Sequence, residues 1–98
     1  MSNVRLTWTL PPVTPRQYSI DYTRIEFRVS DTLPWTEQDV VPASNPQELL
    51  FVDVQPGSFF YRATVVDTEG NEGPPVETSI VLAFDPPGSV TDFIATEE

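Results

Sequence analysis

The sequence predicts an all-β protein, a two-sheet antiparallel β-sandwich with no helix longer than one turn. Short runs of alternating or β-branched residues recur along the chain, and prolines and glycines separate them. Eleven prolines, four glycines and 39% hydrophobic residues fit a β protein rich in turns better than a disordered chain. At 98 residues the chain is long enough for one domain with its own core.

The first strand is predicted near the N-terminus by strict alternation, which is typical of a strand buried on one side. The apolar face holds Val4, Leu6, Trp8 and Leu10, and the polar face holds Arg5, Thr7 and Thr9. Pro11 and Pro12 end the strand, because neither can donate a hydrogen bond to a ladder. Trp8 is expected to be buried in the core, and its replacement by alanine is expected to cost about 3–5 kcal/mol.

Two strands are predicted between residues 20 and 41. An alternating run begins at Ile20 and Tyr22 and changes phase, so a bulge is expected near Thr23-Arg24. After the change, Ile25, Phe27 and Val29 face one side and Arg24, Glu26 and Arg28 the other. In the second strand, residues 35–41, Trp35 either packs across the sheet edge, which we favour, or belongs to an exposed binding surface.

The second half of the chain predicts three more strands. Residues 47–54 are apolar on both faces, and Pro56-Gly57 then forms a turn in which glycine accepts a positive φ. Tyr61, Ala63 and Val65 fall on one face of the following strand, which a polar turn from Asp67 to Gly73 closes. The last strand places Val76, Thr78, Ile80, Leu82 and Phe84 on one face.

The turn, the pattern Tyr61-x-Ala63-x-Val65-x-Asp67 and Gly70-Asn71 together resemble the E–F corner, F strand and F–G loop of a fibronectin type III domain. The resemblance implies an immunoglobulin-like sandwich with strands B, C, C′, E, F and G in chain order. It implies that Leu49 and Phe51 point inward from strand E. It also implies a hydrogen bond from the Tyr61 hydroxyl to a backbone group a few residues upstream.

One residue more than the family pattern separates Gly57 from Tyr61, so Phe60 is the alternative corner aromatic. With Tyr61 chosen, Phe59 and Phe60 are expected on the rim or against a neighbouring domain. The expected core then consists of Trp8, Leu6, Ile25, Phe27, Phe51, Tyr61, Ala63, Val65, Ile80 and Leu82.

The C-terminal segment is expected to lie outside the sandwich. Residues 1–84 are assigned to the sandwich, and residues 85–98 to a semi-rigid linker, Asp85 to Gly88, followed by strand A of a next repeat. Only three residues precede Val4, so strand A of this domain is missing and the edge beside Arg5 and Thr7 is expected to be open. The linker spans at most about 14 Å, whereas a strand of eight residues is about 27 Å long. We therefore do not expect the chain to fill this edge with its own tail.

Composition excludes several classes of function. There is no His, Cys or Lys, so no side-chain pair of the Ser-His, Cys-His or Ser-Lys kind can activate a nucleophile. The net charge of −10, with five arginines as the only basic residues, disfavours nucleic acid and anionic membranes. Asp67, Glu69 and Asn71 have the spacing of a calcium loop, but the rest of that motif is absent. We expect no enzyme and no catalytic, cofactor-binding or metal-binding residues.

Two functions remain. The first is a structural spacer or docking module of a larger extracellular, bacterial surface or phage tail protein, with neighbouring domains of the parent chain as partners. The alternative is an adhesion module that recognises a protein or a glycan through the B–C and F–G loops. Those loops carry only one aromatic residue, Tyr18, which favours the spacer. Weak head-to-tail self-association through the tail is a further hypothesis, and the family resemblance implies an extracellular, cell-surface or virion location.

Overall fold

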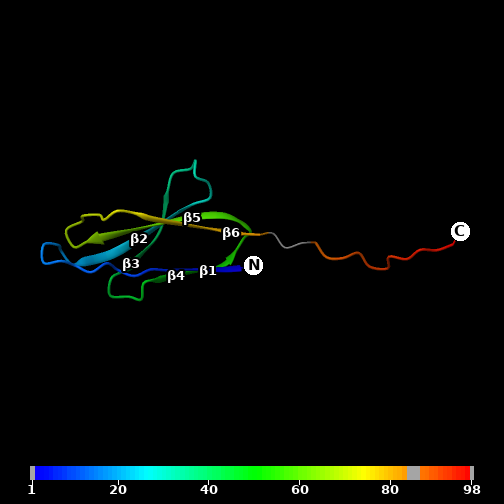
Figure 1. Cartoon of the computed structure of the whole chain (residues 1–98), viewed down its shortest axis with the longest axis horizontal. Coiled ribbons are helices and arrows are strands. Elements are labelled where there is room, and N and C mark those ends of the chain that lie inside the picture. Colours follow the sequence, from blue (N-terminus) through cyan, green and yellow to red (C-terminus); the bar gives the residue numbers. More distant parts are fainter. Residues whose placement is uncertain (1, 84–86, 98) are drawn as a thin grey trace.

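The computed structural model describes residues 2–83 and 87–97, and this part of the chain is all-β (Figure 1). It contains the strands β1 (Ser2–Thr7), β2 (Ile20–Arg28), β3 (Thr36–Pro42), β4 (Glu48–Val54), β5 (Gly57–Asp67) and β6 (Val76–Leu82). All ladders are antiparallel. No described residue is helical, so no helix of the structure is long enough to cross a membrane.

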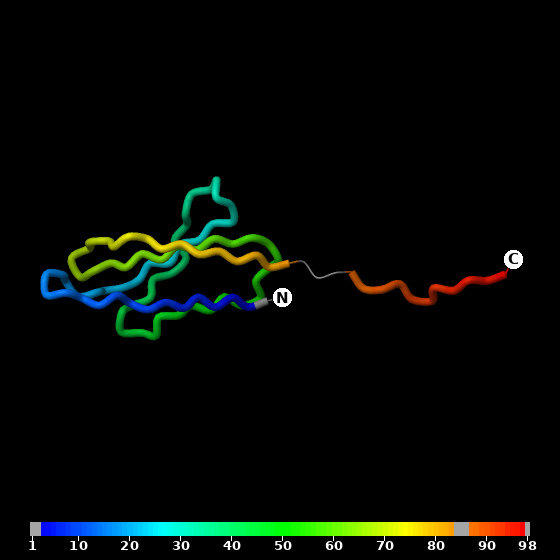
Figure 2. Tube along the Cα trace, viewed as in Figure 1, coloured from blue at the N-terminus to red at the C-terminus, as the bar shows by residue number. Residues whose placement is uncertain are grey.

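The strands form a β-sandwich of two sheets, as the sequence predicts. One sheet has the two strands β1-β4 and the other has the order β3-β2-β5-β6, and Figure 2 shows the two layers. An aromatic contact joins them, because the ring of Phe51 on β4 stacks on the ring of Tyr61 on β5. The strand pairing agrees with the prediction that residues 49 and 51 point inward, because Leu49 lies opposite Leu6 and Phe51 opposite Val4.

The core is smaller than the sequence predicts. Of the ten expected core residues, only Ile25 and Tyr61 are fully buried, and Ile80 is 37% exposed. The other seven are half-buried: Leu6, Trp8, Phe27, Phe51, Ala63, Val65 and Leu82. Val4, Val41, Val66, Thr23 and Thr64 are buried instead. The predicted burial is wrong for side chains on the side of the sandwich that no described strand covers.

The two register shifts of β2 lie on either side of the predicted position. The register against β5 shifts between Ile20 and Tyr22, and the register against β3 shifts between Ile25 and Glu26, so the predicted bulge at Thr23-Arg24 is wrong. With the shift at residue 21, Thr23 and Ile25 lie on the inner face and are the most deeply buried side chains. Val29 does not continue this face: β2 ends at Arg28, and Val29 is exposed.

Tyr61 occupies the inward corner position, but its predicted hydrogen bond is absent. Its side chain is buried, whereas no hydrogen bond joins its hydroxyl to any group in the described part of the chain. Burial against apolar neighbours raises the pKa of Tyr61 above its ordinary value of 10.0. Phe60 lies on the opposite face of β5, half-buried and opposite Arg28 of β2.

The start of β1 and the end of β6 lie at the same end of the sandwich (Figure 1). Ser2 pairs with Val54 and Leu82 pairs with Gly57, three residues further along the chain, where φ is 150°. Residues 87–97 form no strand and leave the sandwich from this end (Figure 2). The predicted strand over residues 89–96 is therefore not formed in the isolated chain. Phe84 and the first two linker residues lie outside the described part.

Candidate functional site

A cavity with a volume of about 860 Å³ forms a groove along one side of the sandwich, between β1 and β6. Its walls come from β1 and from β6, and its floor is the inner face of β2 and β5. The side chains on these walls and the floor are mostly apolar, and they include Leu6, Trp8, Ile25, Ala63, Val65 and Val76. We call this cavity the lateral groove.

The lateral groove is open because both strands that border it are edge strands. Among the described residues, β1 pairs with β4 alone and β6 with β5 alone. Burial along β5 shows the consequence. Its outward Thr64 and Val66 are buried under neighbouring side chains, while the inward Ala63 and Val65 remain half-buried. Across the groove Val76 is 70% exposed, so the inner face of the larger sheet lacks part of its cover.

The edge of β1 offers free backbone groups to a further strand. The backbone N–H of Trp8 bonds to the carbonyl of Gln47, so Trp8 uses its backbone groups on the β4 side. Because successive residues of a strand point their N–H and C=O groups to opposite sides, Arg5 and Thr7 point theirs away from β4. The expected open edge beside Arg5 and Thr7 is present. An edge of this kind is a template for strand addition.

A hydrogen-bonded joint fixes Trp8 at one end of the groove. Gln47 Oε1 accepts from the indole Nε1 of Trp8 at 2.8 Å and from the hydroxyl of Thr23 at 3.3 Å. Its Nε2 donates to the carbonyls of Pro42 and Asn45 at 3.0 and 2.8 Å. Trp8 is thus an oriented wall of the groove, which corrects its expected role as a fully buried core anchor.

The same end of the groove is acidic. Asp67 and Glu72 contribute to its lining there. Glu72 pairs with Arg24, whereas the carboxylate of Asp67 is bound within its own turn. The backbone N–H groups of Glu69 and Asn71 each donate to Asp67 Oδ1 at 2.9 Å, and Asn71 Nδ2 donates to Oδ2 at 3.0 Å. Any charged strand end that enters here meets a negative field.

The pKa of Asp67 follows from this turn. Desolvation raises the pKa, but the hydrogen bonds from the Asn71 side chain and from backbone N–H groups of the turn outweigh it. The net result is a pKa below the ordinary value of 3.8. Because both carboxylate oxygens already accept hydrogen bonds, the turn is ordered by its own donors. The residues at calcium-loop spacing therefore form a polar turn, and the described residues hold no group of three metal ligands.

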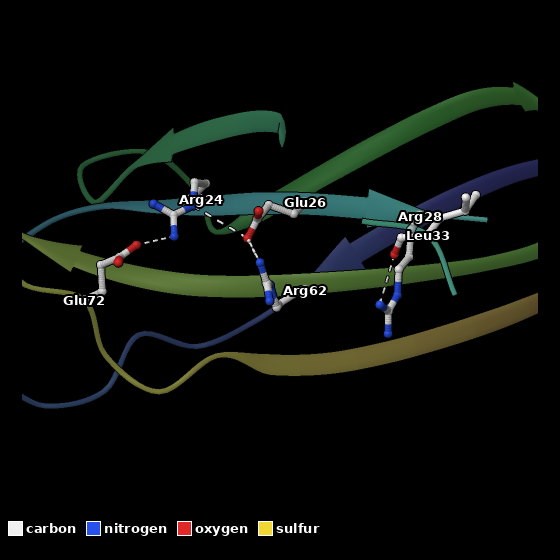
Figure 3. A network of polar contacts seen from close by, with 6 residues as sticks. All are labelled: Arg24, Glu26, Arg28, Leu33, Arg62 and Glu72. Carbon is white, nitrogen blue, oxygen red and sulfur yellow. Dashed lines mark hydrogen bonds and ion pairs between the residues drawn. The ribbon is translucent and has the colours of Figure 1, made fainter. Parts of the chain in front are cut away.

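A second polar cluster lies on the outer face of the larger sheet (Figure 3). Glu26 Oε1 accepts from Arg62 Nε and Nη2 at 3.0 and 2.8 Å, and Arg24 Nε lies 3.7 Å from the same oxygen. Arg24 also pairs with Glu72, and this hydrogen bond raises the pKa of Arg24 although desolvation opposes it. Two of the five arginines, Arg24 and Arg62, are thereby held on one face, and the outward position of Arg24 agrees with the prediction.

Trp35 belongs to this outer cluster. The guanidinium of Arg28 lies 4.1 Å from the centroid of its ring and that of Arg62 lies 4.8 Å from it. Arg28 Nη1 also donates to the carbonyl of Leu33 at 3.2 Å, which fixes the loop before β3 (Figure 3). The half-buried ring therefore packs over the sheet, in agreement with the packing role. Since its charged groups bind one another, the cluster has the properties of a structural network.

No site residues were predicted from the sequence, and the residues that line the groove were not recognised as a group. The open edge beside Arg5 and Thr7 was among the expectations. Nothing in the alternation of residues around Val76 predicted the exposure of its side chain. Comparison of the chain with protein-family models and with curated proteins gave no match.

Proposed function

We propose that this chain is a non-catalytic docking and structural module of the fibronectin type III type that receives an extended protein segment in its lateral groove. The observation that carries the proposal is the coincidence of a free β1 edge and an uncovered apolar floor. Backbone groups of Arg5 and Thr7 supply hydrogen bonds to an added strand. Ala63, Val65 and Val76 then gain the apolar cover that they lack.

The strand arrangement supports the family assignment within this proposal. The pairings β1-β4 and β3-β2-β5-β6 agree with strands B and E in one sheet and C′, C, F and G in the other. The place of strand A is then the open side of β1. In a larger extracellular, bacterial surface or phage tail protein, a neighbouring domain of the parent chain supplies the missing strand. The module then acts as a link between domains.

Strand docking is tested with a peptide whose sequence is unrelated to that of the chain. The probe is a peptide of alternating valine and threonine, about eight residues long to match a strand, with lysine at both ends. Binding is followed by amide exchange, and protection is expected at Arg5 and Thr7, whose N–H groups point away from β4. Unchanged exchange at both amides with the peptide in large excess would contradict the proposal.

A pair of variants at one residue isolates the backbone donor. Thr7→Pro removes an N–H that β4 does not use, and proline is tolerated on the open side of an edge strand. We expect this variant to keep the fold but to lose the protection by the peptide, whereas Thr7→Ala, which keeps the N–H, retains it. Equal binding by both variants would show that the peptide does not add to β1.

A further inference from the structure

We infer that the lateral groove binds residues 90–96 of a second copy of this chain, antiparallel to β1, so that copies associate head to tail. The inference rests on the proposed strand docking and names its occupant. The tail exposes apolar side chains that nothing in its own chain covers: Val90 and Ile94 are 77% exposed and Phe93 is 92% exposed. The groove offers the complementary uncovered surface. Burial of both surfaces in one contact removes both from water.

The lengths of the two segments agree. Residues 90–96 comprise seven residues, and so does the stretch from Asn3 to Thr9, whose part from Leu6 onward lines the groove. An extended antiparallel tail therefore covers this stretch and the ring of Trp8, with Phe93 opposite Leu6 on the inner face. Asp92 has a positive φ of 52° in the isolated chain, so docking moves its backbone into the extended region that an L-residue prefers.

Charge decides which face of the tail enters the groove. In an extended tail, Val90, Asp92 and Ile94 share one face, while Phe93 and Ala95 lie on the other. The first face carries a carboxylate, whose burial without a partner is costly, so the second face enters. Asp92 then points outward on the side of β1 that carries Arg5, and the two charges are opposite in sign.

Charge also decides the direction. Antiparallel to β1, the tail enters at the Trp8 end of the groove and brings Glu97 to the Ser2 end. In the parallel direction Glu97 lies at the acidic end, where Asp67 and Glu72 contribute to the lining. Like charges close together disfavour that arrangement.

The antiparallel direction favours a second copy over the chain's own tail. The tail leaves its sandwich at the Ser2 end of the groove, so it must travel the whole length of the sandwich before it can enter from the other end. From Leu82 to Val90 the chain reaches about 27 Å only if every residue is fully extended. The tail of a copy placed end to end enters directly. Such a contact joins two different surfaces and leaves both free at the ends, so it generates open chains of copies.

The proposal is tested by sedimentation of the full chain from about 10 μM to 1 mM, in about 0.5 M salt to screen repulsion between chains of net charge −10. The mean mass is expected to rise from the monomer value of 11.0 kDa with no plateau at the dimer. A chain that stays monomeric throughout overturns the proposal. So does a monomer whose Phe93 is shielded from solvent, because its own tail then fills the groove.

Two neighbouring tail variants form a matched pair. Phe93→Ser removes the ring that enters the groove and should weaken association by about tenfold to a hundredfold, the range for burial of one aromatic side chain. Ile94→Ser removes an outward apolar side chain and should leave association within about threefold. Both residues are exposed and outside the sandwich, so the fold is unaffected. Equal effects of the two substitutions would overturn the proposed face.

The groove and the tail that enters it are tested separately with a synthetic peptide of residues 87–98. The Phe93→Ser chain that also carries Trp35→Phe has an intact groove and Trp8 as its one tryptophan. Added to this chain, the peptide should shift the emission of Trp8 to shorter wavelength, and the same peptide with serine for phenylalanine should not. If the valine–threonine peptide binds but the tail peptide does not, the docking edge stands and the occupant is wrong. If neither binds, strand docking itself is wrong.

Discussion

Phe51 and Tyr61 stack across the two sheets with ring centroids 5.4 Å apart and an angle of 25° between their planes. The contact joins the middle of β4 to β5 across the two sheets. Val4, which is buried, pairs with Phe51, and Ile25, the most completely buried large apolar residue, lies close to Tyr61 along the inner face. The stacked pair therefore holds the two sheets together beside the lateral groove, whose lining includes Tyr61.

This pair predicts a measurable coupling. Phe51→Leu and Tyr61→Leu each keep an apolar side chain but remove the aromatic contact, which is worth about 0.5–1.5 kcal/mol beyond burial. In a double-mutant cycle measured by urea unfolding, the coupling free energy should fall in that range. A coupling near zero would show that the rings contribute only their apolar area. Phe27→Leu, paired with Phe51→Leu, provides a control without a ring contact to Phe51.

Replacement of Tyr61 by phenylalanine is expected to change the free energy of unfolding by less than about 0.5 kcal/mol. The reason is that the hydroxyl makes no hydrogen bond within the described residues, so no partner is lost. The sequence resemblance alone predicts a loss of about 1 kcal/mol, the usual net worth of one hydrogen bond. Chemical denaturation of the two proteins decides between these values, and a loss of 1 kcal/mol or more would restore the tyrosine corner.

The strands were predictable because the alternation of apolar and polar residues indicates directly which side chains share a face of a strand. Arg24, Glu26 and Arg28 point outward as predicted, and Phe51 and Tyr61 point inward. The degree of burial was not predictable from the same pattern. Ile80 has the pattern of a core residue but is 37% exposed, since cover for the β6 side has to come from a strand that the described chain does not place there. Thr64 has a polar side chain on an outer face, yet long neighbours such as Arg24 cover it.

Gln47 is predicted to stabilise the groove end more than its half-exposed side chain implies. Gln47→Leu leaves the indole N–H of Trp8 and the fully buried hydroxyl of Thr23 without their acceptor. The expected loss is about 1–3 kcal/mol in the free energy of unfolding, the cost of unsatisfied buried polar groups. Gln47→Glu keeps this acceptor but turns a carboxylate towards the carbonyls of Pro42 and Asn45. Its stability should recover at acid pH, where the carboxyl is protonated and can donate again.

Trp35 is predicted to stabilise the outer face through its two cationic neighbours. Trp35→Leu retains an apolar side chain but loses the contacts to Arg28 and Arg62, each worth about 0.5–1 kcal/mol at a partly exposed site. The expected total loss is about 1–2 kcal/mol by urea unfolding. Trp35→Phe keeps an aromatic face and should lose less than the leucine variant. If leucine and phenylalanine were equivalent, the ring would act only as apolar cover.

Asp67 predicts a specific dependence of stability on acid. Its pKa in the folded protein lies below the ordinary value of 3.8, which represents the unfolded chain. The folded state therefore favours the carboxylate, and the resulting stabilisation is fully present above the unfolded pKa. It is lost as the pH falls from about that value through the lower folded pKa, because the protonated carboxyl accepts the turn's hydrogen bonds more weakly.

In Asp67→Asn the free energy of unfolding should decline less steeply between about pH 5 and pH 2 than in the wild type. Glu69→Gln is the matched control, because its carboxylate accepts no hydrogen bond among the described residues, and it should keep the wild-type slope. Equal slopes for Asp67→Asn and the wild type would show that the turn's hydrogen bonds do not favour the charged form.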